Sequence, residues 1–168
     1  MDSTIQRSVR SLALLSVLAG TMALTTGHVA IAGQQPPNSQ AKGIQGAWVL
    51  QVSAHDCQTG APVSNFQSLV TFAQGGTLTN VTTGSSPALR STGLGIWEKT
   101  GDHTFTAVTA AFLFSPVGVW TATQRITNTL EIGGDPDEVT GTTDVQFFDT
   151  NGNLISTACA TVLGRRLD

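Results

Sequence analysis

The sequence predicts an all-β protein, an eight-stranded antiparallel up-and-down barrel, and two observations lead to this fold class. From residue 46 onward, short runs rich in Val, Thr, Phe and Trp alternate with Gly, Asn, Asp and Pro. Charged residues make up only 11% of the chain, against roughly 25% in an average soluble domain, and 18 residues are glycine. This composition suits strands and turns better than a helical bundle.

Residues 1–32 have the composition of a cleavable signal peptide. Arg7 and Arg10 precede an apolar stretch over 12–19, and small residues occupy 30–32, where a signal peptidase would cleave. The alternative is a membrane anchor, but the apolar stretch is interrupted and falls short of the roughly 20 residues that a spanning helix needs. We therefore expect export, with no membrane attachment after cleavage.

The remainder of the chain is long enough for one domain with a core and too short for two. Residues 33–42 include two prolines and are predicted to be a flexible leader. Residues 43–168 then form the barrel domain. The predicted location of the mature protein is secreted or periplasmic.

Eight strands are predicted in chain order. Their ranges are 46–54, 66–73, 76–83, 93–100, 103–114, 117–132, 138–149 and 153–166. Several connections between them carry the Gly, Asn, Asp or Pro residues that suit antiparallel hairpins. Sequential strands therefore pair, and such a meander removes its exposed edges by closing into a barrel.

The first five strands offer several markers. The first begins with Gly46-Ala47-Trp48, and glycines separate the second from the third. The fourth contains two glycines, which allow a strand to bend at a barrel corner. If Trp97 points inward, alternation places Glu98 outside. Phe112 in the fifth strand is a further candidate for the inner face.

The sixth and seventh strands show their two faces most clearly. Even positions of the sixth strand, from Trp120 onward, are mainly apolar but include Gln124 and Asn128, whereas the odd positions are polar. In the seventh strand the odd positions, including Phe147, are the more apolar. We expect these two sets to face the barrel interior.

Cys57 and Cys159 are the only cysteines and are predicted to form one disulfide, as exported proteins favour. If the barrel closes, the first strand runs antiparallel to the eighth, and facing residues have a constant sum of residue numbers. That sum is 216 for the cysteines and 214 for Trp48 with Arg166, an agreement within one bulge. The alternative, a Cys57 nucleophile activated by His55, requires a free thiol in an oxidising compartment.

The chain resembles the calycin superfamily, particularly the lipocalins. The matching features are Gly46-Ala47-Trp48 at the start of the first strand, the eight-strand meander, and Arg165 or Arg166 at the end of the last strand. In lipocalins the tryptophan of a Gly-x-Trp motif packs beneath such an arginine at the closed barrel end. The resemblance thus implies that Trp48 packs with an arginine, which the index sum identifies as Arg166. The allene oxide cyclase-like barrels are similar in size, and the motif does not separate the two groups.

Composition and motifs also indicate what the protein does not do. Eight Lys and Arg residues against 11 acidic residues leave a net charge of −3, which argues against a nucleic-acid partner. The histidines lack the paired spacing of a metal site, and no cofactor motif is present, so neither a metal nor a cofactor is expected. The predicted inner face carries no acidic residue and no histidine, so an acid–base pair is hard to build there. Asn80-Val81-Thr82 matches an N-glycosylation sequon, which matters only in a eukaryotic secretory pathway.

The leading functional hypothesis is a barrel that binds a small apolar or amphipathic ligand, with aromatic walls for affinity and polar amides for orientation. The residues predicted to line the site are Trp97, Phe112, Trp120, Gln124, Asn128 and Phe147. Ordinary core packing is the alternative for the aromatic residues. The alternative functions are an allene oxide cyclase-like cyclase or isomerase, and a filled barrel with a structural or interaction role in the cell envelope. A connected apolar cavity would distinguish the first two functions from the third.

Overall fold

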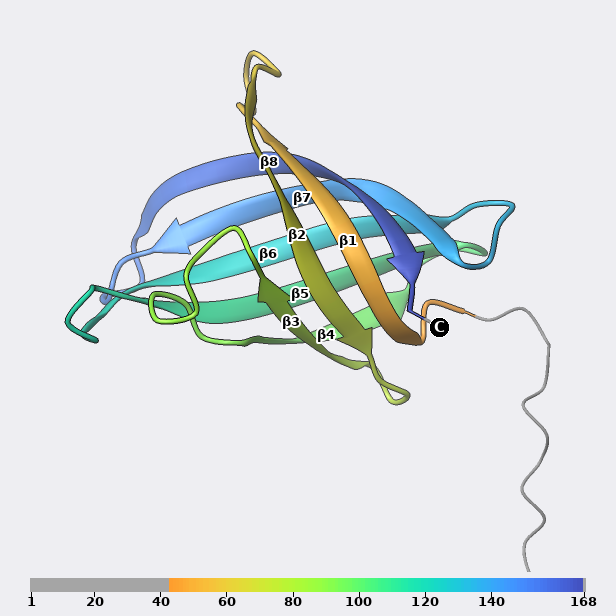
Figure 1. The fold of residues 1–168 in the computed structure, drawn as a ribbon, viewed down its shortest axis with the longest axis horizontal. Helices are drawn as coiled ribbons and strands as arrows, with labels where there is room; N and C mark the ends of the chain where they lie inside the picture. Colours follow the sequence, from red (N-terminus) through yellow and green to blue (C-terminus); the bar gives the residue numbers. More distant parts are fainter. Residues whose placement is uncertain (1–42, 168) are drawn as a thin grey trace, which may run out of the picture. The chain divides into compact units, whose positions relative to one another are not determined.

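The computed structural model describes residues 43–167, which form one closed barrel of eight antiparallel strands (Figure 1). The strands are β1 (Gly46–His55), β2 (Pro62–Phe72), β3 (Thr77–Thr82), β4 (Gly93–Lys99), β5 (Thr104–Phe114), β6 (Trp120–Ile132), β7 (Glu138–Phe148) and β8 (Leu154–Arg166). Each strand pairs with its sequence neighbours, and β1 also pairs with β8. The up-and-down barrel predicted from the sequence is therefore confirmed. The predicted signal peptide (1–32) and leader (33–42) lie outside the described residues.

The strand boundaries agree with the predicted ranges to within a few residues. The largest difference is in β2, which begins at Pro62 rather than at 66, because its first residues continue the ladder to the last residues of β1. Strand β6 begins at Trp120 rather than at 117. Within the described part of the chain, no helix has the length and hydrophobicity to cross a membrane.

The end of the barrel where β1 begins and β8 ends is packed around Trp48, and we call it the closed end. Trp48 is completely buried, and its Nε1 donates a 2.7 Å hydrogen bond to the Ile44 carbonyl oxygen. The guanidinium carbon of Arg166 lies 4.3 Å from the centroid of the Trp48 ring, which is cation–π geometry. The β1–β8 ladder pairs Trp48 directly with Arg166, as the index sum predicts.

Arg166 also joins β8 to two other segments at the closed end, the residues before β1 and the β6–β7 connection. Its Nε donates to Oδ1 of Asp137 at 2.7 Å, and its terminal nitrogens donate to the carbonyl oxygens of Gly43, Gln45 and Pro136. Gly46 has a φ of +123°, and a Cβ there would lie 2.8 Å from Nη1 of Arg166. Glycine is therefore required at this position both by its backbone conformation and by the guanidinium beside it.

Aromatic side chains fill the rest of the closed end. The ring of Trp97 makes edge contacts with the rings of Phe72 and Phe105, each with 6.1 Å between centroids. Trp97 Nε1 donates to the Ala73 carbonyl oxygen at 3.0 Å, so its polar atom is satisfied. The inward orientation expected for Trp97 is confirmed, but the ring is partly buried and packs against the hydrophobic core.

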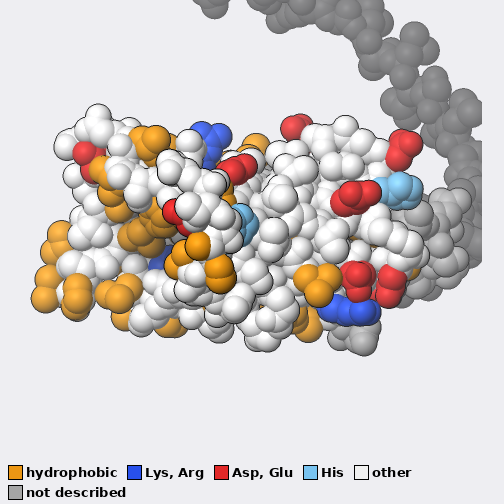
Figure 2. All heavy atoms as spheres, turned by 90° about the horizontal axis from the view of Figure 1, so that it is seen from above, with side chains coloured by type: hydrophobic (Ala, Val, Ile, Leu, Met, Phe, Trp, Pro, Cys, Tyr) orange, Lys and Arg blue, Asp and Glu red, His pale blue; other side chains and the backbone are white. Residues whose placement is uncertain are grey.

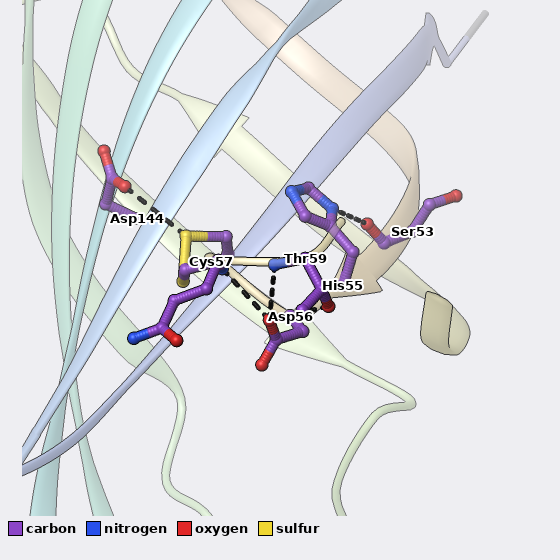
Figure 3. Close-up of a disulfide and its surroundings, with 8 residues drawn as sticks. Ser53, His55, Asp56, Cys57, Thr59 and Asp144 are labelled. Atoms are coloured by element: carbon purple, nitrogen blue, oxygen red, sulfur yellow. Dashed lines mark hydrogen bonds between the residues drawn. A yellow bond between two sulfur atoms is a disulfide. The ribbon is translucent and has the colours of Figure 1, made fainter. Parts of the chain in front are cut away.

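The predicted disulfide between Cys57 and Cys159 is present and ties β1 to β8 at the other end of the ladder (Figure 3). The two Cα atoms are 5.2 Å apart. Every pair of the β1–β8 ladder has the index sum 214, so Cys159 faces His55. No bulge is needed, because Cys57 meets Cys159 after the strand has ended.

The turn that carries Cys57 is organised by Asp56 (Figure 3). Oδ1 of Asp56 accepts hydrogen bonds from the backbone N–H and the hydroxyl of Thr59, at 2.7 and 2.8 Å, and from the Gln58 N–H at 3.0 Å. These bonds, led by that from the Thr59 N–H, hold the pKa of Asp56 below its ordinary value. The turn therefore positions Cys57 through local hydrogen bonds.

We expect no free thiol in the unreduced, exported protein. The bridge closes a loop with a sequence separation of 102, so Cys57→Ala combined with Cys159→Ala should lower the free energy of unfolding by about 4–5 kcal/mol. Thiol titration of unfolded protein and urea denaturation measure the two effects. Reduced wild type, which should show both thiols, is the control; two free thiols without reductant would contradict the bridge.

Trp48→Ala should lower the free energy of unfolding by about 3–5 kcal/mol, because it leaves a cavity and removes the cation–π contact. Arg166→Ala should cost less, since the indole remains in place. Trp120→Ala is a matched control, because that tryptophan is 43% exposed and its loss should have a smaller effect. A Trp48 variant that unfolds like the parent would show that this ring does not anchor the closed end.

Candidate functional site

A cavity of about 240 Å³ occupies the part of the barrel that the aromatic core does not fill. It extends from Phe72 and Leu130 near the closed end to Gly84 and Ser85 in the β3–β4 connection. One wall, from β1, β2 and β8, is mainly apolar and includes Leu50, Val52, Val70, Ala160 and Val162. The other side of the lining, from β3, the β3–β4 connection and β5–β7, mixes apolar residues such as Ile126 and Phe147 with polar ones, and we call it the polar wall. Its main polar members are Asn80, Arg90, Thr109, Gln124, Asn128 and Thr143.

Three of the six predicted site residues line this cavity. Gln124 and Asn128 from β6 and Phe147 from β7 all contribute to it, and Gln124 pairs with Phe147 across the two strands. Alternation therefore identified the inner faces of both strands correctly along this stretch. Trp97 faces inward but packs against the core rather than lining the cavity.

The expectation that Phe112 faces inward is wrong. Phe112 is 53% exposed, whereas its neighbour Ala111 is buried. The inner face of β5 is formed by odd-numbered residues such as Thr109 and Ala111, and this strand has apolar residues on both faces. The alternation of apolar and polar residues in β5 is therefore too weak to indicate which face of the strand points inward.

The inward orientation of Trp120 is also wrong, and a β-bulge is the reason. Ala122 pairs with Leu113, but Trp120 pairs with Phe114, which leaves Thr121 as an extra residue in β6. An extra residue reverses the alternation beyond it. Trp120 therefore points to the outside of the barrel, although Ala122 points inward.

Phe112 and Trp120 meet on the outer surface, with 5.8 Å between their ring centroids. They belong to a group of exposed apolar side chains near the β5–β6 and β7–β8 hairpins. That group consists of Phe112, Val117, Val119, Trp120, Leu154 and Ile155. Figure 2 shows hydrophobic side chains gathered at this end of the barrel. The two aromatic residues are thus surface residues.

Arg90, which no motif or alternation in the sequence singles out, is buried inside the barrel with 7% of its surface exposed. Its Nε donates to Oε1 of Gln124 at 2.7 Å, its Nη2 to Oδ1 of Asn80 at 3.0 Å, and its Nη1 to the Ser91 carbonyl oxygen at 3.3 Å. Burial lowers the pKa of Arg90 from its ordinary value. One signal was available, because no other Lys or Arg lies between Lys42 and Lys99.

The segment that carries Arg90 is fixed against β5. Arg90 forms an isolated β-bridge with Leu113, and the Phe114 N–H donates to the Leu89 carbonyl oxygen at 2.9 Å. Gly93 then leaves room for the guanidinium, since a Cβ there would lie 3.3 Å from Nη2 of Arg90 and 2.6 Å from Cγ2 of Thr109. The backbone therefore directs this arginine into the barrel.

Asn80 faces inward and is only 9% exposed, so its side chain belongs to the cavity. The asparagine of the sequon therefore lies on the inside of the folded barrel. Its amide oxygen binds Arg90.

Amide side chains make the polar wall rich in hydrogen-bond donors. The oxygens of Asn80 and Gln124 accept from Arg90, and that of Asn128 accepts from the Thr143 hydroxyl at 2.7 Å. Within residues 43–167, the amide NH2 groups of these three residues donate to no protein acceptor. Each amide therefore offers unused N–H donors to the cavity.

The titratable chemistry of the cavity is limited. Among the described lining residues, Arg90 is the one charged side chain, and there is no carboxylate or histidine. Both cysteines are in the disulfide. Residues 43–167 contain no group of three His, Cys, Asp or Glu side chains that could hold a metal ion. The arrangement can bind and orient a molecule, but offers no acid–base pair.

No protein-family model matches the chain, and no curated protein matches its sequence. The class to which the protein belongs is therefore defined by its architecture, a closed eight-stranded up-and-down β-barrel with an internal cavity.

Gln124→Leu should lower the free energy of unfolding by about 1–3 kcal/mol, because it leaves the buried Nε of Arg90 without an acceptor. Asn128→Leu removes only a bond from the neutral Thr143 hydroxyl and should cost about 0.5–1.5 kcal/mol. Urea denaturation of both variants measures the difference. Equal losses, or a more stable Gln124 variant, would show that the arginine does not depend on this amide.

Proposed function

We propose that this barrel binds a small, largely apolar molecule in its cavity. The observation that carries the proposal is the cavity itself, about 240 Å³ with a largely apolar lining into which one side contributes polar side chains. Protein interiors are close-packed, and voids larger than a water molecule are few. Pockets for drug-sized ligands measure about 300–1,000 Å³, so the molecule bound here is small.

The lining supports binding rather than acid–base catalysis. General acid–base catalysis needs a titratable side chain within reach of the reacting proton, and among the described lining residues only Arg90 carries a charge. An arginine keeps its proton at neutral pH. The cavity also argues against a filled barrel with a purely structural role, because that role does not require an internal space.

Membership of the calycin superfamily and export are part of the same proposal. The closed end supports the first, since Gly46, Trp48 and Arg166 stand in the arrangement that the lipocalin resemblance implies. The disulfide supports the second, because such bonds persist in oxidising compartments. A secreted or periplasmic carrier of a small apolar ligand accounts for both features.

Native mass spectrometry of protein purified from its source should show a retained small molecule, and calorimetry should show binding of 1-octanol as a neutral apolar probe. Ala160→Leu adds bulk to the buried apolar wall and should weaken 1-octanol binding about tenfold, the equivalent of 1.4 kcal/mol. Ala110→Leu, at an exposed position on β5, is the matched control and should bind normally. The proposal fails if no molecule is retained and 1-octanol does not bind.

A further inference from the structure

Arg90 is a buried positive charge in an otherwise uncharged cavity lining. Its three hydrogen-bond acceptors are all neutral, namely the side-chain oxygens of Gln124 and Asn80 and the carbonyl oxygen of Ser91. In the described part of the chain, every ion pair involves Arg165 or Arg166 instead. A buried charge is costly unless an opposite charge compensates it, so Arg90 lacks the partner that such a group normally has.

The hydrogen-bond capacity of this cluster points to what is missing. A guanidinium has five N–H donors, and three of those of Arg90 are used, which leaves one on each terminal nitrogen. Because arginine has no acceptor, Asn80 and Gln124 must turn their amide oxygens toward it, and their NH2 groups remain as donors. The site thus presents several unused donors around one positive charge.

We infer that the ligand carries a carboxylate that binds to Arg90, so that the ligand class is a small apolar carboxylic acid. This inference rests on the proposed function. A carboxylate accepts two parallel N–H bonds from a guanidinium and brings one negative charge to the one positive charge present. A phosphate dianion would leave an uncompensated negative charge in the cavity. The hydrocarbon part of the ligand lies against the apolar wall formed by residues such as Leu50, Val70 and Ala160.

The experiment compares octanoate with octanamide, which has nearly the same shape but no charge, by calorimetry on the barrel at neutral pH. Octanoate should bind about 10- to 100-fold more tightly, as expected for hydrogen bonds to a charged group. Octanamide should bind more weakly, because it brings no charge and only one acceptor oxygen, and its NH2 group replaces the second acceptor of the carboxylate by a donor. This comparison uses the wild-type protein and requires no variant.

Arg90→Gln should abolish the preference for octanoate over octanamide, because the one charged side chain of the described lining is lost. Circular dichroism and urea denaturation of the variant report whether the barrel remains folded. Arg125→Gln is the matched control, because Arg125 is exposed on the outer face of β6 and its replacement changes the net charge equally. That variant should keep the preference. If Arg90→Gln fails to fold, the wild-type comparison decides the inference.

Three results have distinct meanings. A preference for octanoate that depends on Arg90 supports the inference. Equal affinities for octanoate and octanamide, or a preference that survives Arg90→Gln, overturn it while 1-octanol binding keeps the proposed function intact. Failure of all three probes to bind overturns both.

Discussion

The pairing of β1 with β8 is the constraint on which the rest of the structure depends. An open meander would expose the backbone groups of two edge strands, and this ladder satisfies both edges at once. Its register also places Arg166 over Trp48 at one end and Cys159 beside His55 at the other. The cation–π contact and the disulfide to Cys57 therefore stabilise the two ends of the β1–β8 ladder.

Closure creates an interior that is packed unequally. Large rings, among them Trp48 and Trp97, fill the closed end, whereas small side chains such as Ala107 and Ala160 leave space above it. That space has a polar wall because Arg90 enters it and orients the amides around its guanidinium. A cavity and a buried charge both lower the stability of an empty barrel, and both features support the proposal that the barrel binds a molecule.

Much of the fold follows from local patterns that the sequence displays directly. Side chains alternate between the two faces of every strand, so the apolar sets in β6 and β7 revealed the inner positions of Gln124, Asn128 and Phe147. Turn residues marked the hairpins, and consecutive hairpins imply an antiparallel meander. With only two cysteines in the chain, Cys57 had a single possible intramolecular partner in Cys159.

The sequence by itself determined the strand order, the pairing of β1 with β8 and part of the cavity wall. Each of these depends on the alternation of side chains along a strand, on turn residues, or on the constant sum of residue numbers in an antiparallel pair. Only the tertiary structure decided the orientation of Trp120, because the bulge that reverses it arises from pairing with β5. The same holds for Arg90, which lies between strands, where alternation assigns no face. Its bridge to Leu113, distant in sequence, directs the guanidinium inward. Such orientations depend on contacts between distant segments, which no local pattern encodes.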